Sequence, residues 1–214
     1  MQYVNTLKKI EDEGIVAVVR ADSTEKAKKI IDAIHAGGIN AVELTYTIPD
    51  ANSLIKEFSD NPNLFVGAGT VLDAVSARIS IIAGARFIVS PLFDEATAKM
   101  CNLYQIPYIP GCMTVNEAKH ALEAGANIIK LFPGSVVGSK MIKSIKAPLP
   151  QVNIMVTGGV NTKNIKDWFV AGCTAVGTGG SLTKPAETGD YESVSKNAAE
   201  MVAEVRKAQK ELYK

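Results

Sequence analysis

The stretch GIVAVVRADSTEKAKKIIDAIHAGG, residues 14–38, contains a complete strand-and-helix unit. The run IVAVVR is typical of a parallel strand covered on both faces, because such strands are almost continuously apolar. Asp22 and Ser23 can cap the helix that follows. Apolar residues then recur at the spacing of one helical face: Ala27, Ile30, Ile31 and Ile34. Gly37 stands where this helix should end, so the stretch predicts a strand followed by an amphipathic helix.

The same unit recurs along the chain at intervals of about 20 to 26 residues. Eight β-rich runs begin near Ile15, Ala41, Leu64, Phe87, Pro107, Ile128, Asn153 and Ala175. Later helices carry their own start signals: Thr114 with Glu117 forms a capping box, and Asn161 can cap a helix that contains Ile165. Eight such units predict an α/β fold in which parallel strands close into a TIM (β/α)8 barrel.

Two further helices complete the expected architecture. Residues 3–13 are expected to form an extra N-terminal helix over the bottom of the barrel, and the apolar spacing of Val194, Ala198 and Val205 predicts a long closing helix. The alternative, an open doubly wound sheet, usually has about five or six strands. Since no linker or change in composition divides the chain, we expect residues 1–214 to form a single (β/α)8-barrel domain.

Composition and charge narrow the class of function. The chain has 23 Lys and Arg against 22 Asp and Glu, so no net field favours nucleic acid or an anionic membrane. The N-terminus lacks the apolar core of a signal peptide, and no run approaches the roughly 18 apolar residues of a membrane span. The three cysteines have no C-x-x-C spacing, and two histidines offer little material for a metal centre. We therefore expect a cytoplasmic protein with a small-molecule partner, without metal, cofactor, nucleic acid or membrane.

Three charged residues interrupt strand runs: Arg20, Glu43 and Lys130. Each is unusual, because burying an unpaired charge costs several kcal/mol. Side chains alternate along a strand, which places Lys130 on one face with Phe132, and Glu43 on one face with Thr45. All three charges can then converge inside the barrel mouth. Active sites of TIM barrels lie at this end, where the strands finish.

Lys130 and Glu43 permit two interpretations. They can form a buried ion pair that completes the core. Alternatively, loss of hydration in an apolar strand favours the neutral amine of Lys130, which can attack a carbonyl and form a Schiff base. Glu43 would then move the protons that this chemistry requires.

Glycine pairs end the last two strands. Residues 156–161 read VTGGVN, and residues 176–181 read VGTGGS. In TIM barrels the loops after strands seven and eight commonly hold phosphate, because glycine lets backbone N–H groups approach the anion. Tight turns alone would also explain glycine at these positions. Two pairs on successive final strands favour a phosphate site.

With these residues located, the chain resembles the 2-keto-3-deoxy-6-phosphogluconate (KDPG) aldolase family, whose members often also cleave 4-hydroxy-2-oxoglutarate (KHG). The matching segments are GIVAVVR at 14–20, VELTYT at 42–47, GAGTV at 67–71, SP at 90–91, IPGCMT at 109–114, IKLFPG at 129–134, TGGV at 157–160 and GTGGS at 177–181. The resemblance implies a class I, metal-free aldolase that cleaves KDPG to pyruvate and glyceraldehyde 3-phosphate. It also implies Lys130 as Schiff-base former, Glu43 as general acid and base, and a homotrimer.

The resemblance further implies roles for the surrounding residues. Thr70 would contact the carboxylate end of pyruvate, and Pro91 would border the site. The other expected substrate-binding positions, Arg20, Thr45 and Phe132, lie on the inward strand faces assigned above. The phosphate-binding positions would be Gly158, Gly159, Gly179, Gly180 and Ser181. Some members carry an arginine four residues after the catalytic glutamate to hold a substrate anion, and this chain has Thr47 there. Arg20, which shares the inward face, is the candidate to hold that anion instead.

Other functions share part of this pattern. A related 2-dehydro-3-deoxy-6-phosphogalactonate aldolase would use the same residues. A phosphate-binding barrel isomerase or epimerase would share the glycine pairs, although metal-dependent epimerases need two histidines at strand ends. A non-catalytic sugar-phosphate sensor would keep the glycines and need no lysine on the sixth strand.

Overall fold

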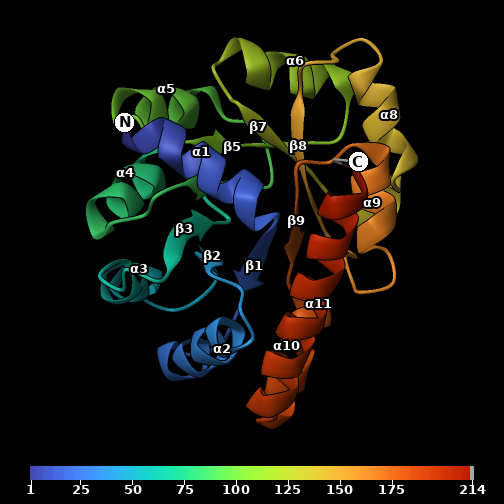
Figure 1. Ribbon diagram of the computed structural model, residues 1–214. Coiled ribbons are helices and arrows are strands. Elements are labelled where there is room, and N and C mark those ends of the chain that lie inside the picture. Colours follow the sequence, from blue (N-terminus) through green and yellow to red (C-terminus); the bar gives the residue numbers. More distant parts are fainter. Residues whose placement is uncertain (213–214) are drawn as a thin grey trace.

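The expected strands form one sheet that curls into a barrel in the computed structural model, which describes residues 1–212 (Figure 1). Over these residues the order is β5-β4-β3-β2-β1-β9-β8-β7-β6, and every neighbouring pair is parallel. The strands are β1 (Ile15–Val19), β2 (Ala41–Thr45), β3 (Phe65–Gly69), β4 (Ile88–Val89), β5 (Tyr108–Ile109), β6 (Gly111–Cys112), β7 (Ile128–Leu131), β8 (Asn153–Thr157) and β9 (Ala175–Thr178). The eight predicted runs are confirmed, since β5 and β6 are two parts of the fifth.

Pro110 divides the fifth strand, because proline has no N–H to donate to a ladder. β5 pairs with β4, and β6 pairs with β7. The chain runs through Pro110 between them, and the Pro110 carbonyl accepts a hydrogen bond from the Lys130 N–H at 2.8 Å. The two ends of the ladder therefore meet at this residue, and the barrel closes beside Lys130.

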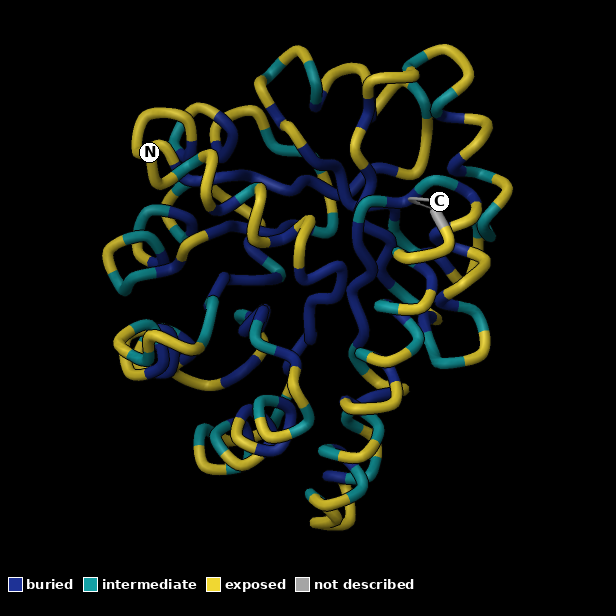
Figure 2. Tube along the Cα trace, viewed as in Figure 1, coloured by how far each residue is buried: buried dark blue, intermediate teal, exposed yellow. Residues whose placement is uncertain are grey.

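Helices surround the barrel, and Figure 2 shows the buried strands inside a ring of partly exposed helices. The extra N-terminal helix is α1 (Gln2–Glu13), and the predicted closing helix is α11 (Tyr191–Leu212), which packs against several other helices of the ring. The others are α2 (Thr24–Ala36), α3 (Ala51–Ser59), α4 (Ala74–Ala83), α5 (Glu95–Leu103), α6 (Val115–Glu123), α7 (Gly134–Val137), α8 (Lys140–Lys146), α9 (Ile165–Ala171), α10 (Gly180–Thr183) and the 3-10 helix η1 (Lys184–Thr188).

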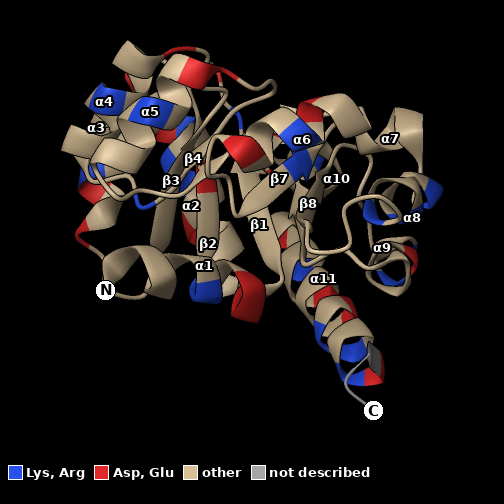
Figure 3. Cartoon of the chain, turned by 90° about the horizontal axis from the view of Figure 1, so that it is seen from above, with Lys and Arg blue, Asp and Glu red and all other residues tan. Residues whose placement is uncertain are grey.

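The apolar core has an inner and an outer part. Inward-facing strand residues fill the barrel: Val16, Ala41, Phe87, Val89, Ile109, Ile128, Met155 and Ala175. Ile10 of α1 is fully buried against them, so α1 closes the N-terminal end of the barrel, beneath the strands in Figure 3. The outward faces of the strands pack against the helices. Above the inner core the inward positions become polar, and this end holds the site.

Capping residues set several helix starts. The Ser23 hydroxyl accepts a hydrogen bond from Lys26 N at 3.4 Å, and the capping box of Thr114 is present. The expected cap at Asn161 is wrong, because α9 begins directly after Asn164 and Asn161 Oδ1 instead accepts a hydrogen bond from Lys163 N at 3.0 Å in the preceding turn. Asparagine side chains bond turn backbone as readily as they cap helices, so the sequence did not separate the two roles.

Charged side chains lie mainly on the outer helices, and α11 carries many of them (Figure 3). Over residues 1–212, no helix is both long enough and apolar enough to cross a membrane. The cysteines of this part of the chain are buried free thiols. Burial raises the pKa of the thiols of Cys101, Cys112 and Cys173, and that of the Tyr108 phenol, to about 12.

We expect the free energy of unfolding to be fully retained below about pH 9 and to fall as the pH rises towards 12. In the unfolded chain the thiols ionise near pH 9.0 and tyrosine near pH 10.0, whereas the fold keeps these groups protonated. Each group then lowers the unfolding free energy by up to about 1.4 kcal/mol per pH unit. Urea unfolding at pH 8 and pH 10.5 measures the loss, and equal free energies at the two values would contradict it.

Candidate active site

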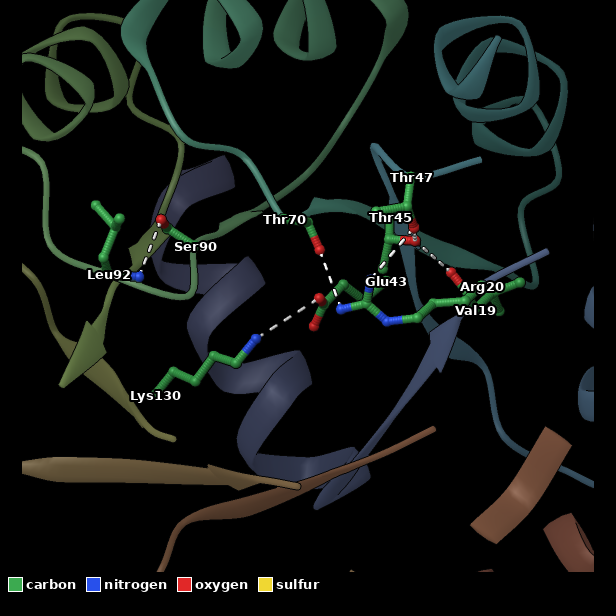
Figure 4. A network of polar contacts seen from close by, with 9 residues as sticks. All are labelled: Val19, Arg20, Glu43, Thr45, Thr47, Thr70, Ser90, Leu92 and Lys130. Carbon is green, nitrogen blue, oxygen red and sulfur yellow. Dashed lines mark hydrogen bonds and ion pairs between the residues drawn. The ribbon is translucent and has the colours of Figure 1, made fainter. Parts of the chain in front are cut away.

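Lys130 and Glu43 face each other inside the barrel mouth, as strand alternation predicts (Figure 4). Lys130 comes from β7 and Glu43 from β2, and the distance from Nζ to Oε1 is 3.9 Å. The lysine side chain is 3% exposed and the glutamate side chain 0%. Neither carboxylate oxygen has a hydrogen-bond partner in the described part of the chain. A purely structural buried carboxylate would need such partners, so their absence argues against a merely structural role for Glu43.

Gly69 makes room for the Glu43 carboxylate. It ends β3, the strand next to β2, and a Cβ atom at this position would overlap Oε1, Cγ and Cδ of Glu43. Gly67, two residues earlier on the same strand, makes room in the same way for the Phe87 ring. The inward face of β3 is therefore fitted to larger side chains from neighbouring strands.

Arg20 reaches across the mouth from the end of β1. Its Nη1 donates to Thr47 Oγ1 and its Nη2 to Thr70 Oγ1, each at 3.2 Å (Figure 4). Thr70 has a φ of 58°, a left-handed conformation that costs a β-branched residue on the order of 1–3 kcal/mol. Such strain clusters at binding sites, and here the Thr70 hydroxyl is held against the Arg20 guanidinium.

The remaining expected substrate-binding residues lie at different depths. Phe132 lies beside Lys130, whose Nζ is 4.9 Å from the centre of its ring. Thr45 is fully buried, with its hydroxyl donating to Val19 O at 2.9 Å and 2.7 Å from Thr47 Oγ1. Pro91 is partly exposed after β4. The structure thus places Phe132 at the lysine, and Thr45 in the wall behind it.

A cavity of about 310 Å³ joins the lysine to the glycine pairs. Its lining consists of Val18, Arg20, Lys130, Phe132, Thr157, Gly158, Gly159, Val160, Asn161, Gly179, Gly180 and Ser181. All the expected phosphate-binding residues therefore share one cavity with the lysine and the arginine. Glu43, Thr45, Thr70 and Pro91 are not part of this lining.

The glycine pairs present free backbone donors. Within residues 1–212, the N–H groups of residues 158–160 and 179–181 have no hydrogen-bond acceptor. Gly158 and Gly159 have φ values of 95° and 78°, which glycine adopts without strain. The Ser181 hydroxyl donates to Val160 O and so joins the two strand tips. Successive free N–H groups in such a turn form a concavity that binds anions.

Thr157 also lines the cavity and is not among the site residues predicted from the sequence. Its Oγ1 is buried and has no hydrogen-bond partner in the part of the chain that the structure describes. An unpaired buried hydroxyl costs about 1–3 kcal/mol, so this one is placed for a ligand. The alternation that turns Lys130 inward on β7 could have identified Thr157 on β8.

These features define a class: a TIM-barrel enzyme with a buried lysine–carboxylate pair and anion-binding strand tips at its mouth. No group of three or more His, Cys, Asp or Glu side chains in the described residues is arranged to hold a metal ion. The family model for KDPG and KHG aldolase matches residues 6–197. The chain therefore belongs to the KDPG and KHG aldolase family, and it is a lyase of that type, as its resemblance predicts.

Similar proteins match nearly the whole chain. The 2-dehydro-3-deoxy-6-phosphogalactonate aldolase of Escherichia coli strain K12 is 32% identical over 197 residues, 91% of this chain and 95% of that protein. The KHG/KDPG aldolase of the same strain is 34% identical over 193 residues, 88% of this chain and 90% of that protein. The KDPG aldolase of Legionella pneumophila was solved with pyruvate captured at low pH as a covalent carbinolamine intermediate. It is 28% identical with a TM-score of 0.80, over 87% of this chain and 92% of that chain.

We expect Gly69→Ala to lower the aldolase kcat more than Gly67→Ala does. Either methyl group crowds the barrel interior and lowers stability, but only the one at Gly69 overlaps the Glu43 carboxylate. Displacing a reacting group by about 1 Å can cost roughly 100-fold in rate. Cleavage rates at equal folded fraction, with melting temperatures, measure the difference. Equal losses in the two variants would show that crowding alone is responsible.

Proposed function

We propose that the protein is a class I aldolase that reversibly cleaves KDPG to pyruvate and glyceraldehyde 3-phosphate, and also KHG to pyruvate and glyoxylate. The observation that carries the proposal is the buried Lys130 amine, 3.9 Å from a carboxylate and on the wall of a cavity that ends in the glycine pairs. The covalent carbinolamine of the Legionella relative supports the same chemistry here.

Lys130 begins the reaction as a nucleophile. The lone pair of its amine nitrogen attacks the C2 ketone of the substrate and gives a carbinolamine. Loss of water then forms an iminium, whose cationic nitrogen withdraws electrons from C3. The Phe132 ring, 4.9 Å from Nζ, lies where it can attract that cation.

Glu43 moves the protons. Its carboxylate takes the proton of the C4 hydroxyl while the electron pair of the C3–C4 bond moves into the iminium. Glyceraldehyde 3-phosphate leaves as the aldehyde, and an enamine remains on Lys130. The protonated Glu43 returns its proton to C3, and water hydrolyses the resulting imine to pyruvate and the free amine.

The two ends of the substrate are anionic, and the cavity offers a separate partner to each. Arg20, held by Thr47 and Thr70, supplies a cation for the carboxylate. The phosphate would accept hydrogen bonds from the free N–H groups at the strand tips: Gly158, Gly159, Gly179, Gly180 and Ser181. Between them, the unpaired Thr157 hydroxyl can bond a substrate hydroxyl. Thr45, being fully buried, would support Thr47, and Pro91 would border the site.

A second substrate is the galactonate epimer, which differs from KDPG in the configuration at C4. The 32% identity to the galactonate enzyme of Escherichia coli supports this candidate. Both epimers place the ketone, carboxylate and phosphate alike, so one lysine chemistry serves both. Values of kcat/KM for the two epimers and for KHG rank the three substrates.

We expect borohydride with pyruvate to fix a stable adduct on Lys130, because reduction of the imine makes the carbon–nitrogen bond permanent. Lys130→Arg keeps the charge but offers no neutral amine, so both the adduct and the cleavage of KDPG should disappear. Mass spectrometry of the trapped protein locates the modified residue. An adduct on another lysine, or activity that a chelator abolishes, would contradict the assignment.

Glu43→Gln is the matched variant in the same experiment. It preserves the shape of the side chain and leaves Lys130 free to form the adduct. Cleavage, and exchange of the pyruvate methyl protons with solvent, should both slow by about 10² to 10⁴. Unchanged exchange together with a lower melting temperature would reduce the pair to a structural role.

The homotrimer implied by the family resemblance has a candidate interface on α4. Large apolar side chains on its outward face are 43% to 68% exposed: Val75, Ile79 and Ile82. Leu103, at the end of neighbouring α5, is 72% exposed, and Arg78 stacks on the Tyr104 ring at 3.9 Å. The two helices therefore present one continuous apolar surface. A contiguous surface of this kind is typical of protein–protein contact, and a second copy of the chain is the proposed occupant.

We expect the wild-type chain to have three times its 22.7 kDa mass in solution. The double variant Val75→Glu with Ile82→Glu should be monomeric, because burying two carboxylates in an apolar contact is unfavourable. Light scattering after size exclusion measures both masses. Val170→Glu, at a 55% exposed position on α9, is the control and should stay trimeric. A monomeric wild type, or a double variant that remains a trimer, would exclude this interface.

A further inference from the structure

The carbonyl of Gly159, at the tip of β8, is held by two asparagine side chains. Asn164 Nδ2 donates to Gly159 O at 2.8 Å, and Asn161 Nδ2 donates to the same oxygen at 3.1 Å. Two amide donors on one exposed carbonyl are more than solvation requires. They fix the direction in which this peptide group points.

The Asn164 amide is itself fixed in orientation. Its Oδ1 accepts a hydrogen bond from Asn161 N at 2.9 Å while its Nδ2 donates to Gly159. An amide that both accepts and donates has only one orientation that satisfies both partners. Asn164 therefore acts as a brace between the start of α9 and the glycine tip.

The brace determines where the neighbouring N–H groups point. In a planar trans peptide the C=O of one residue and the N–H of the next are antiparallel, so holding Gly159 O directs the Val160 N–H to the opposite side. The next carbonyl, Val160 O, is held by the Ser181 hydroxyl. The carbonyls of Gly159 and Val160 are thus occupied, whereas the N–H groups of residues 158–160 have no acceptor in the described residues. Residues 158–160 also line the cavity.

We propose that Asn164 is a positioning residue for phosphate recognition, which it controls through the Gly159 peptide without touching the substrate. The proposal rests on the proposed phosphate site and deepens it. Asn164 is not part of the cavity lining, and it makes no contact with Lys130 or Glu43. Its loss should therefore weaken the hold on the phosphate end more than the chemistry at the lysine.

The test compares Asn164→Ala with Asn102→Ala. Asn102 Nδ2 donates to the carbonyl of Ala124 at 2.9 Å, the same kind of bond between two helices away from the cavity. For Asn164→Ala we expect the ratio of kcat/KM on KDPG to kcat/KM on KHG to fall about 10- to 100-fold. This is the loss expected when one hydrogen bond to a charged group, here the phosphate, is removed. In Asn102→Ala this ratio should stay at the wild-type value. Asn161→Ala removes the second donor to Gly159 and should shift the ratio in the same direction. Because Asn161 also lines the cavity, this variant supports the inference only together with Asn164→Ala or with the phosphate titration below.

Calorimetric titration with inorganic phosphate separates this inference from the proposed function. Wild-type protein should bind phosphate, and Asn164→Ala should bind it about 10- to 100-fold more weakly, whichever sugar acid is the substrate. Equal loss on KDPG and KHG, an unchanged ratio, or unchanged phosphate affinity would overturn the role of Asn164. A wild type that binds no phosphate would overturn it as well. A wild type that binds phosphate but cleaves neither substrate would instead reject the proposed function.

Discussion

The burial of one lysine and one glutamate side chain inside an apolar barrel is the constraint on which the rest of the site depends. Ionisable groups in such surroundings need a close partner, so β2 and β7 must keep a fixed separation across the barrel. Neighbouring residues fit this pair: Gly69 leaves space for the Glu43 side chain, and the Phe132 ring faces the Lys130 nitrogen. Pro110 interrupts the ladder, yet its carbonyl still binds the backbone of Lys130 and keeps β7 in register.

The two ends of the barrel differ in their residues: apolar side chains at one end stabilise the fold, and polar side chains at the other form the candidate site. Its lower part is filled by apolar side chains and closed by Ile10 of α1, so the strands are held rigidly from below. At the upper end the inward positions become Glu43, Lys130 and Thr157, and the side-chain oxygens of Glu43 and Thr157 have no hydrogen-bond partner in the described residues. Such groups are costly in an empty site and become useful when a substrate supplies the missing partners. The apolar lower core is what allows the upper end to keep them.

Much of this organisation could be read from the residues one strand at a time. The apolar runs and their spacing predict the parallel barrel, because a strand covered on both faces is apolar at nearly every position. Lys130 and Glu43 stand out because a charge in such a run is costly, and alternation assigns each to the inward face. The glycine pairs stand out because they end two successive final strands, although a tight turn alone would also explain glycine at either position. The error at Asn161 arose where a turn and a helix cap use the same residue type.

The sequence by itself thus determined which segments form strands and which form helices, through the spacing of their apolar residues. It also determined on which face of its strand or helix each side chain lies. Only the tertiary structure decided which faces meet. Three features of the site depend on contacts between segments or across a turn. Gly69 lies against Glu43, Thr157 lacks a hydrogen-bond partner in the described residues, and Asn164 braces Gly159. The outward apolar face of α4 is likewise invisible in sequence, because a helix apolar all round does not reveal which side the barrel covers. Periodicity is a property of one segment, whereas contact, burial and hydrogen-bond satisfaction belong to pairs of residues brought together by the fold.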